Sequence, residues 1–291
     1  MRVADLLSEA TATLSAAGVA SPRVDAELLA AHVLGVPRGR LLGAADPDQS
    51  VVQSYRSLVE RRARREPLQH MTGTAPFRYA ELAVGPGVFI PRPETEQLVM
   101  WGLSWLRTQE IRVPRIVDLC AGSGAIAVAT ITEKQGGARV WAVEQDPAAI
   151  SWLHRNAEPH GVTVVQGDAT DPAVLRDLDG LVDLVLTNPP YVPEIGAAGL
   201  PPEVLEHDPH AAVFGGTDGL DVIRPLIARV AALLRPGGAV ALEHDETHAY
   251  VVPTLISAPG GFELIELHHD LARRPRFTTA VRAGAATRMA D

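Results

Sequence analysis

The sequence predicts an α/β protein in which a helical N-terminal part precedes a parallel sheet covered by helices on both faces. Apolar residues recur at helical spacing over about the first 70 residues. The remainder alternates short apolar runs with helical patterns. Strands joined by helical crossovers form a parallel sheet with helices on both faces. No internal repeat interrupts this order.

The composition is that of a globular protein. The 291 residues are 46% hydrophobic and 21% charged, values that exclude wholesale disorder. The single cysteine, Cys120, rules out an internal disulfide or a cysteine-based zinc cluster and fits a reducing compartment. No apolar run in the sequence is long enough to span a membrane. We therefore expect a cytoplasmic protein with no membrane partner.

Charge is spread unevenly along the chain. Residues 1–85 carry 10 Arg against 9 Asp and Glu, whereas residues 86–291 carry 16 Lys and Arg against 26 Asp and Glu. So acidic a second half is a poor electrostatic match for a phosphate backbone. The sequence therefore disfavours nucleic acid as the direct substrate.

The first part of the chain predicts a small all-α domain. Helices are expected over Asp5–Leu14, from an N-cap at Ser21 to a stop at Gly35, and over Gln49–Glu66. The third helix carries five arginines, which indicate a solvated face or, as the alternative, a contact for an acidic partner or RNA. They are Arg56, Arg61, Arg62, Arg64 and Arg65. Because the segment is nearly neutral overall, we interpret residues 1–75 as a protein-recognition domain.

A β-hairpin is expected to join the two parts of the chain. Apolar residues alternate on both sides of Gly85-Pro86-Gly87 between Phe77 and Ile90, and Pro91–Glu96 then begins a helix. The predicted domains are therefore 1–75, a hairpin linker at 76–92, and 93–291. In the last, strands are expected at Ile116–Cys120, Val140–Val143, Val162–Val165, Leu181–Thr187, Ala239–Glu243, Phe262–His268 and Arg276–Val281. Helices are expected at Ala125–Lys134, Pro147–Asn156, Pro172–Leu178, Leu220–Leu234 and Glu246–Ile256, with a turn at Pro236–Gly238.

The most informative segment is Asn188-Pro189-Pro190-Tyr191, which follows a buried strand. Two consecutive prolines remove two N–H donors, so the turn offers mainly acceptors. The Asn188 carboxamide adds an acceptor oxygen, and the Tyr191 ring adds a flat wall. Such a pocket suits a planar –NH2 group whose nitrogen is left facing an electrophile. An ordinary Asn-Pro turn is the alternative.

Asn188 is the last of four polar residues that lie at the ends of consecutive strands. Asp118, Glu144, Asp168 and Asn188 lie 26, 24 and 20 residues apart, each about one strand–helix unit. They therefore fall on the same edge of the sheet, where ligands bind. Glu144 is suited to accept both hydroxyls of a ribose, and Asp168 to accept from an exocyclic amine.

The glycine loop after the first strand indicates the kind of ligand. Gly122-Ser123-Gly124 permits close approach of the backbone, but Ala125-Ile126-Ala127 follows instead of the third glycine of a dinucleotide fingerprint. A nucleoside without a pyrophosphate is therefore favoured, with Asp118 near a cationic group. An adenosyl sulfonium with an amino-acid tail fits this description.

Several motifs resemble the HemK/PrmC family of protein-(glutamine-N5) methyltransferases, which act on peptide chain release factors. The resemblance covers nearly the whole chain, and Phe89–Glu96 is its most specific part. The other matching segments are Ser21–Leu29, Asp118–Gly124, Asn188–Tyr191, Glu203 through Asp208-Pro209, Gly215–Leu220 and Asp270–Ala272.

The resemblance implies a seven-stranded, Rossmann-like methyltransferase domain behind a helical domain that helps to hold the release factor. It also implies S-adenosylmethionine as the methyl donor and the glutamine of a Gly-Gly-Gln motif as the acceptor. Carried over to this sequence, Asn188, Pro189, Pro190 and Tyr191 hold the glutamine amide. The cofactor residues are Asp118, Cys120, Ala121, Gly122, Ser123, Gly124, Glu144, Asp168, Ala169 and Asn188.

The chain departs from the family pattern at a few positions. Cys120-Ala121 replaces Gly-Thr, and Ala169 replaces a residue that is often aromatic beside the adenine. Leu242–His248 and Gln69–Gly73 also depart from the usual forms. These differences bear on affinity and folding, and leave the expected reaction unchanged.

Four alternatives remain open at this point. An adenine-N6 DNA methyltransferase uses the same turn, but no target-recognition insertion is evident. A methyltransferase for a ribosomal-protein glutamine and a non-catalytic nucleotide- or RNA-binding module are the next two. The fourth is a metal site at His207 and His210 or at His268 and His269, which have no carboxylates at metal spacing. We expect no metal, and no nucleophilic role for Cys120.

Overall fold

The structure, a computed structural model, describes residues 2–284 and divides the chain into two compact units. The helical unit consists of Met1–Thr74 together with Pro201–His207. The sheet unit consists of Ala75–Leu200 and Asp208–Asp291. The short segment Pro201–His207 therefore belongs to the helical unit although it lies far along the chain.

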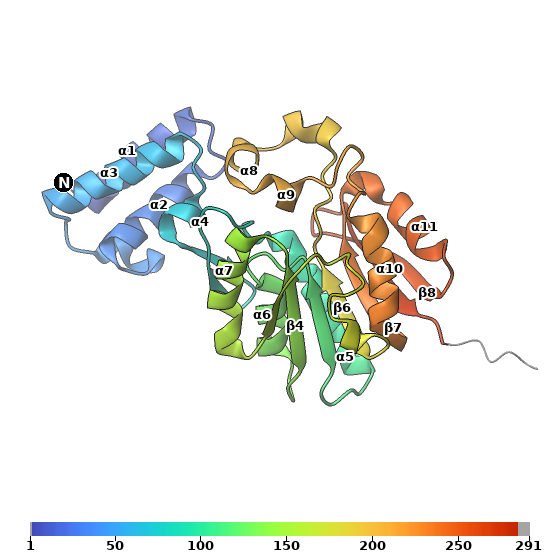
Figure 1. Cartoon of the computed structure of the whole chain (residues 1–291). Coiled ribbons are helices and arrows are strands. Elements are labelled where there is room, and N and C mark those ends of the chain that lie inside the picture. The colour runs from blue at the N-terminus through green and yellow to red at the C-terminus, as the bar shows by residue number, and fades with distance from the viewer. Residues whose placement is uncertain (1, 285–291) are drawn as a thin grey trace, which may run out of the picture. The chain divides into compact units, whose positions relative to one another are not determined.

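The helical unit contains the three helices that the sequence predicts. Tyr55 is buried in its core and donates from its hydroxyl to the Ala26 carbonyl at 3.0 Å. Asp48 caps the third helix by accepting from the Val51 amide, whereas Ser21 holds the predicted N-cap position without making a side-chain capping bond. The Ser21 backbone (φ −129°, ψ 59°) departs from the extended geometry in which a cap hydroxyl reaches the helix amides. The α-helices are α1 (Val3–Ala16), α2 (Pro22–Leu34), α3 (Gln49–Ala63), α4 (Leu68–Thr72) and α8 (Pro202–His207), with a 3₁₀ turn η1 at Arg38–Gly43 (Figure 1).

Arg62 of α3 and Arg65, just beyond the end of that helix, hold the α8 segment within the helical unit. The Glu203 carboxylate accepts from Arg62 at 2.8 Å and from Arg65 at 2.8 and 2.7 Å. Arg62 also donates to Asp25 at 2.7 Å. Burial alone would raise the pKa of Glu203, but the hydrogen bonds from Arg65 and Arg62 outweigh it and lower the pKa to about 2.

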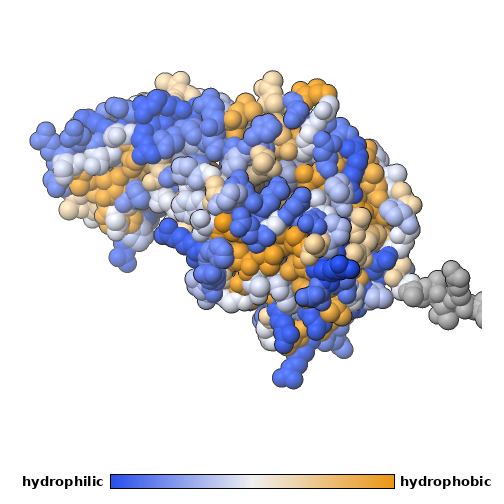
Figure 2. All heavy atoms as spheres, in the orientation of Figure 1, coloured by the Kyte–Doolittle hydropathy of each residue, from blue (hydrophilic) through white to orange (hydrophobic). Residues whose placement is uncertain are grey.

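These contacts correct part of the prediction for the α3 arginines. Arg62 is buried and paired with acids of its own unit, so it is not on a solvated face. Arg56 and Arg64 are exposed as predicted, and α1 and α3 present a largely hydrophilic face in Figure 2. The sequence alone could not separate these two groups, because the acids that pair with Arg62 come from α2 and α8.

Glu203→Gln is expected to loosen α8, and the effect should depend on pH. The pKa of Glu203 is lowered by folding, so its contribution is present above the ordinary value near 4.5 and is lost as the pH falls toward about 2. Hydrogen–deuterium exchange of a peptide covering Pro201–His207 should be faster in the variant at pH 6, and the difference should shrink below pH 4.5 and vanish only as the pH reaches about 2. Glu206→Gln, an exposed neighbour, is the matched control. Equal exchange in variant and wild type at pH 6 would contradict the assignment.

The hairpin lies earlier in the chain than the sequence predicts. Its strands are β1 (Thr74–Phe77) and β2 (Ala80–Ala83), so the reversal falls at Arg78-Tyr79 and not at Gly85–Gly87. Arg78 adopts a left-handed backbone (φ 52°), and its guanidinium donates to Glu133 at 2.5 and 2.6 Å. These tertiary bonds stabilise a turn that has no glycine or proline at its centre.

The sheet unit contains one seven-stranded sheet in the order β5-β4-β3-β6-β7-β9-β8. Strands β5, β4, β3, β6 and β7 are parallel, while β9 runs antiparallel to β7 and β8. The chain order reverses between β3 and β6, and such a switch point opens a crevice at the carboxyl ends of the strands. The predicted α/β class and the seven-stranded methyltransferase-type sheet are confirmed. The strands are β3 (Arg115–Leu119), β4 (Arg139–Glu144), β5 (Thr163–Gln166), β6 (Val182–Thr187), β7 (Leu234–Glu243), β8 (Phe262–His269) and β9 (Pro275–Arg282).

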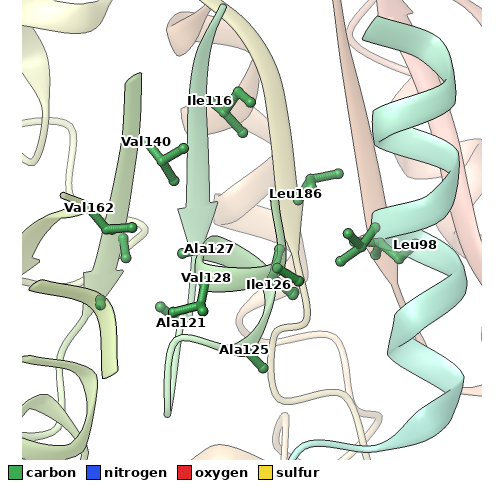
Figure 3. Packing of buried hydrophobic residues seen from close by; sticks show 14 of the residues in the cluster. Leu98, Ile116, Ala121, Ala125, Ile126, Ala127, Val128, Val140, Val162 and Leu186 are labelled. Atoms are coloured by element: carbon green, nitrogen blue, oxygen red, sulfur yellow. The ribbon is translucent and has the colours of Figure 1, made fainter. Parts of the chain in front are cut away.

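Helices cover both faces of this sheet, as predicted. On one face the apolar side chains of α5, α6 and α7 pack on the strands. Ile116, Val140 and Leu186 of the strands belong there to one buried cluster with Leu98 and Ile126 of the helices (Figure 3). On the other face α10 and α11 pack against β3, β6 and β7. The helices are α5 (Glu96–Thr108), α6 (Ala125–Glu133), α7 (Pro147–Ala157), α9 (His210–Val213), α10 (Ile223–Leu233) and α11 (Val251–Ser257). The 3₁₀ turns are η2 (Pro93–Thr95), η3 (Glu158–His160), η4 (Arg176–Leu178), η5 (Glu194–Gly199) and η6 (Glu246–His248).

Two local predictions in the sheet unit are wrong. The helix expected over Pro172–Leu178 is only the turn η4, because Leu175 adopts a left-handed backbone (φ 57°) that a helix cannot continue through. Pro236–Gly238 is not a turn but lies inside β7, where the pairing with β6 shifts between Val182 and Leu184. Among residues 2–284, no helix is both long and apolar enough to cross a membrane.

Candidate active site

A cavity of about 310 Å³ lies where β3, β4, β5 and β6 end. The sheet unit alone supplies its walls. Most of the residues predicted for the site line it: Cys120, Ala121, Gly122, Ser123, Glu144, Asp168, Ala169, Asn188 and Pro190. Asp118, Gly124, Pro189 and Tyr191 are not among the lining residues, so their contributions have to be indirect or made through the backbone.

The glycine loop turns sharply between β3 and α6. Cys120, Gly122 and Gly124 all have left-handed backbones, with φ of 62°, 55° and 85°. A Cβ on Gly124 would lie 2.7 Å from a methyl group of Leu153 in α7, so this glycine is needed for close packing. The loop thereby brings Gly122 and Ser123 to the cavity wall and starts α6 directly behind it.

Glu144 joins the loop after β3 to the loop after β4. One carboxylate oxygen accepts from the Gly122 amide and the other from the Asp146 amide, both at 2.8 Å. Each carboxylate oxygen has two lone pairs, so these bonds leave capacity for further hydroxyl donors. Glu144 lines the cavity in a fixed orientation, which fits its predicted role toward a ribose.

Asp118 is fully buried beneath the glycine loop. Its carboxyl accepts from the Ala127 amide at 3.0 Å in the first turn of α6, where a negative charge is favourable. Burial raises the pKa of this carboxyl well above its ordinary value. The structure therefore places Asp118 as a support of the loop, and the predicted contact with a cationic group stays a prediction.

The segment after β5 forms the next part of the wall. Asp168 accepts from the amide and the hydroxyl of Thr170, both at 2.8 Å, which fixes its side chain, and Ala169 is buried beside it. Cys120 also lines the cavity, and burial raises the pKa of its thiol well above its ordinary value. A protonated thiol is a poor nucleophile, so Cys120 is a packed wall residue.

The Asn188–Tyr191 turn begins at the end of β6. The Asn188 carboxamide nitrogen donates to the Thr95 hydroxyl at 3.2 Å, which leaves the carboxamide oxygen to accept from a ligand. The Tyr191 hydroxyl donates at 3.0 Å to Glu243, a carboxyl that is 1% exposed at the end of β7. Both side chains of the turn are therefore fixed by polar contacts from other elements of the sheet unit.

The segment before α5 supplies site residues for which the sequence reasoning gave no role. Phe89, Pro91, Arg92 and Thr95 line the cavity. Arg92 pairs with the buried Asp208 carboxylate and lies over the Phe89 ring, 4.9 Å from its centre. The signal was present in the sequence, since Phe89–Glu96 and Asp208-Pro209 both belong to the motifs that carry the family resemblance.

Histidines do not gather into a metal site in the described part of the chain. No group of three or more His, Cys, Asp and Glu side chains there is arranged to hold a metal ion. His268 instead interacts with the Thr279 hydroxyl at 2.8 Å and stacks on the Phe277 ring.

Two family comparisons cover both units. Residues 5–73 match the family described as "PrmC N-terminal domain", and residues 77–198 match "Conserved hypothetical protein 95". The chain is 51% identical over 281 residues to the release factor glutamine methyltransferase of Mycolicibacterium smegmatis, covering 97% of this chain and 98% of that protein. It is 49% identical to the protein of the same name from Corynebacterium glutamicum, with coverage of 96% and 99%.

A solved structure shares the architecture of the sheet unit. The catalytic domain of hMettl16 in complex with the MAT2A 3'UTR hairpin 6 superposes with a TM-score of 0.53 over 69% of this chain and 75% of that chain. The sequence identity is 14%, so this likeness concerns the fold alone.

Proposed function

Because the chain belongs to the family of release factor glutamine methyltransferases, we propose that its acceptor is the glutamine of the Gly-Gly-Gln motif in peptide chain release factors. Family and fold make it a methyltransferase enzyme that depends on S-adenosylmethionine, so a non-catalytic binding module is excluded. The finer statement, which atom of which protein receives the methyl group, is the proposal.

The orientation of Asn188 is the observation that supports this acceptor most directly. Its carboxamide nitrogen is occupied by Thr95, so its oxygen is the group available to accept an N–H from a substrate amide. The following prolines present carbonyls without competing N–H donors, and Pro190 lines the cavity. An acceptor-rich turn of this kind fits a primary amide.

The chemistry requires positioning more than acid–base catalysis. An amide nitrogen is a weak nucleophile because its lone pair is delocalised into the carbonyl. We assign the Asn188 oxygen and the Pro189 carbonyl as acceptors for the two N–H bonds, with Tyr191 supporting the turn from outside the cavity. These contacts turn the lone pair toward the methyl group that S-adenosylmethionine supplies when bound. Removal of water from the cavity strengthens the same contacts.

The residues of the cavity fit S-adenosylmethionine as the cofactor. Glu144 faces the cavity with acceptor capacity to spare for ribose hydroxyls, and Asp168 and Ala169 form the adjacent wall. Gly122 and Ser123 allow the backbone to approach the ligand closely. We propose the cytoplasm as the compartment, where both release factors and this cofactor occur.

Mass spectrometry of a release factor after incubation with this protein and S-adenosylmethionine tests the proposal. We expect one added methyl group on the Gly-Gly-Gln glutamine, and none on a factor in which that glutamine is replaced by alanine. Ribosomal proteins and adenine-containing DNA, offered in parallel, test the two rival acceptors. Methylation of either rival with an unmodified release factor would overturn the proposed substrate.

We further propose that residues 1–75 recognise the folded release factor. A chain beginning at Ala75 is then expected to bind S-adenosylmethionine normally but to methylate the intact factor poorly, mainly through a raised KM, with some loss of kcat because remote contacts also orient the substrate. Truncation should reduce methylation of a short Gly-Gly-Gln peptide much less. Unchanged cofactor affinity shows that the sheet unit has folded. If truncation leaves methylation of the intact factor untouched, the helical part serves another purpose.

Glu144→Ala is expected to weaken binding of S-adenosylmethionine and of its demethylated product to similar extents. Charged hydrogen bonds contribute about 1.5–3 kcal/mol, so the dissociation constants should rise roughly 10- to 150-fold. Calorimetry measures both. Glu263→Ala, which removes an exposed acid from β8, is the control. Unchanged affinity in Glu144→Ala would show that the end of β4 does not hold the ribose.

A further inference from the structure

A single buried carboxyl stands behind the Asn188–Tyr191 turn. Glu243 ends β7, and it does not line the cavity. One of its oxygens accepts from the Tyr191 hydroxyl at 3.0 Å. The other is buried and makes no hydrogen bond of good geometry. A buried carboxylate oxygen without a donor is costly, so a neighbouring hydroxyl is strongly favoured to point its proton toward it.

The Thr95 side chain, which is 3% exposed, is close enough to the Glu243 carboxyl to act on it. Hydrogen bonding from Thr95 stabilises the charged form of Glu243, as does the bond from Tyr191. The Thr95 oxygen accepts from the Asn188 carboxamide nitrogen at 3.2 Å. Since a hydroxyl has one proton, Thr95 can accept from Asn188 and donate to Glu243 at the same time.

Asn188, Thr95 and Glu243 thus form a hydrogen-bond series. The direction of each bond in this series follows from the carboxylate of Glu243, which only accepts. Glu243 therefore compels Thr95 to donate, and Thr95 can then only accept from Asn188. An asparagine side chain has two orientations that differ by exchange of its oxygen and nitrogen. The series selects the orientation with the nitrogen toward Thr95 and the oxygen toward the cavity.

We propose that Glu243 and Thr95 are positioning residues for methyl transfer. Glu243 sets the orientation of Asn188 through Thr95 and holds Tyr191 directly, so one carboxylate fixes both polar side chains of the acceptor turn. The predicted effect of these two residues on catalysis rests on the proposed function. The hydrogen-bond series itself is a property of this chain alone.

The charge state of Glu243 links this series to pH. Burial raises the pKa of Glu243 to about 7, opposed by Thr95, Tyr191 and Arg276 of β9, while Glu94 adds to the rise. The adjacent His244 is neutral at this pH, since burial lowers its pKa to about 4. Protonated Glu243 has a proton to donate and competes with Thr95 and Tyr191. The orientation of Asn188 should therefore be held above about pH 7 and loosened below it.

Turnover measurements on release factor test the catalytic part. Thr95→Val removes both bonds of the hydroxyl and should lower kcat about 10-fold or more, with cofactor affinity unchanged. Thr95→Ser keeps the hydroxyl and should restore most of the rate. Glu243→Gln should lower kcat and abolish its decline below about pH 7. Thr130→Val, the same change at a buried threonine of α6 that does not line the cavity, is the control. A Thr95→Val enzyme within twofold of wild-type kcat would overturn the role.

Nuclear magnetic resonance of the Asn188 side-chain amide tests the series without any substrate. The signal, identified by its loss in Asn188→Asp, should exchange slowly with solvent and shift with a midpoint near pH 7 in the wild type. Both properties should be lost in Thr95→Val, and the pH-dependent shift should disappear in Glu243→Gln. If the signal ignores both substitutions, the inference is wrong whatever the acceptor is. If it responds while release factor stays unmethylated, only the proposed function fails.

Discussion

Asn188→Ala is expected to lose most methyl transfer while binding S-adenosylmethionine almost normally. The carboxamide oxygen is positioned to accept from the reacting amide, so its bond matters most as the nitrogen attacks. Removing one such positioned group typically costs about 2.7–4 kcal/mol, which corresponds to roughly 10²–10³ in kcat. The alanine methyl group also leaves the Thr95 hydroxyl without the donor that Asn188 supplies.

Single-turnover rates and calorimetry on the same preparation separate the two effects. In Asn188→Ala the single-turnover rate of methyl transfer should fall, while the dissociation constant of the cofactor should stay within about a factor of three of the wild-type value. The comparison with Glu144→Ala is informative because the two variants should show opposite patterns. An Asn188→Ala enzyme that retains more than about a tenth of wild-type turnover would remove Asn188 from the proposed role.

Gly219→Ala is expected to be the most damaging small substitution near the site. The added Cβ would lie 2.3 Å from the Tyr191 carbonyl oxygen and 2.8 Å from the His248 ring. The residue also has a left-handed backbone (φ 78°), which costs about 1–2 kcal/mol once a Cβ is present. The Tyr191 backbone must therefore move, and Asn188 and Pro189 belong to the same four-residue turn.

We expect kcat for Gly219→Ala to fall about 100-fold or more, with a lower melting temperature. Gly199→Ala is the matched control, because its Cβ would meet nothing within 4 Å and its backbone is not left-handed. Turnover and thermal unfolding of both variants give the answer. A Gly219→Ala enzyme with turnover close to that of Gly199→Ala would show that the position of the Tyr191 carbonyl is unimportant.

The sequence predicted those features that depend on short-range order. Asp118, Glu144, Asp168 and Asn188 all lie close to the carboxyl ends of consecutive strands, so their intervals alone place them near one edge of the sheet. Three of the four line the cavity. Asp118 does not, because a strand's last residues alternate between its two faces and the interval cannot tell which face each side chain takes.

The features that the sequence could not predict depend on contacts between distant segments. Thr95 meets Asn188 across 93 residues, and Tyr191 meets Glu243 across 52. Separations of 93 and 52 residues match no helix or strand periodicity, so the sequence gives no reason to expect either contact. The same holds for the hairpin, where Arg78 replaces the usual glycine because Glu133, from α6, pairs with its guanidinium. Local turn propensity predicted the chain reversal at Gly85–Gly87, but the Arg78–Glu133 ion pair stabilises it at Arg78-Tyr79.

Because Pro201–His207 belongs to the helical unit, this unit cannot be exchanged between relatives as a single segment of chain. Neither unit is a continuous stretch of chain: the path leaves the sheet unit after Leu200 and returns at Asp208. A chimaera made by joining a different N-terminal domain at Thr74 would keep Glu203 but lose Arg62 and Arg65, its partners. Swapping recognition domains among relatives therefore requires two grafts that change together. Over evolutionary time, substitutions in α3 and in this distant heptapeptide should be inherited as matched sets.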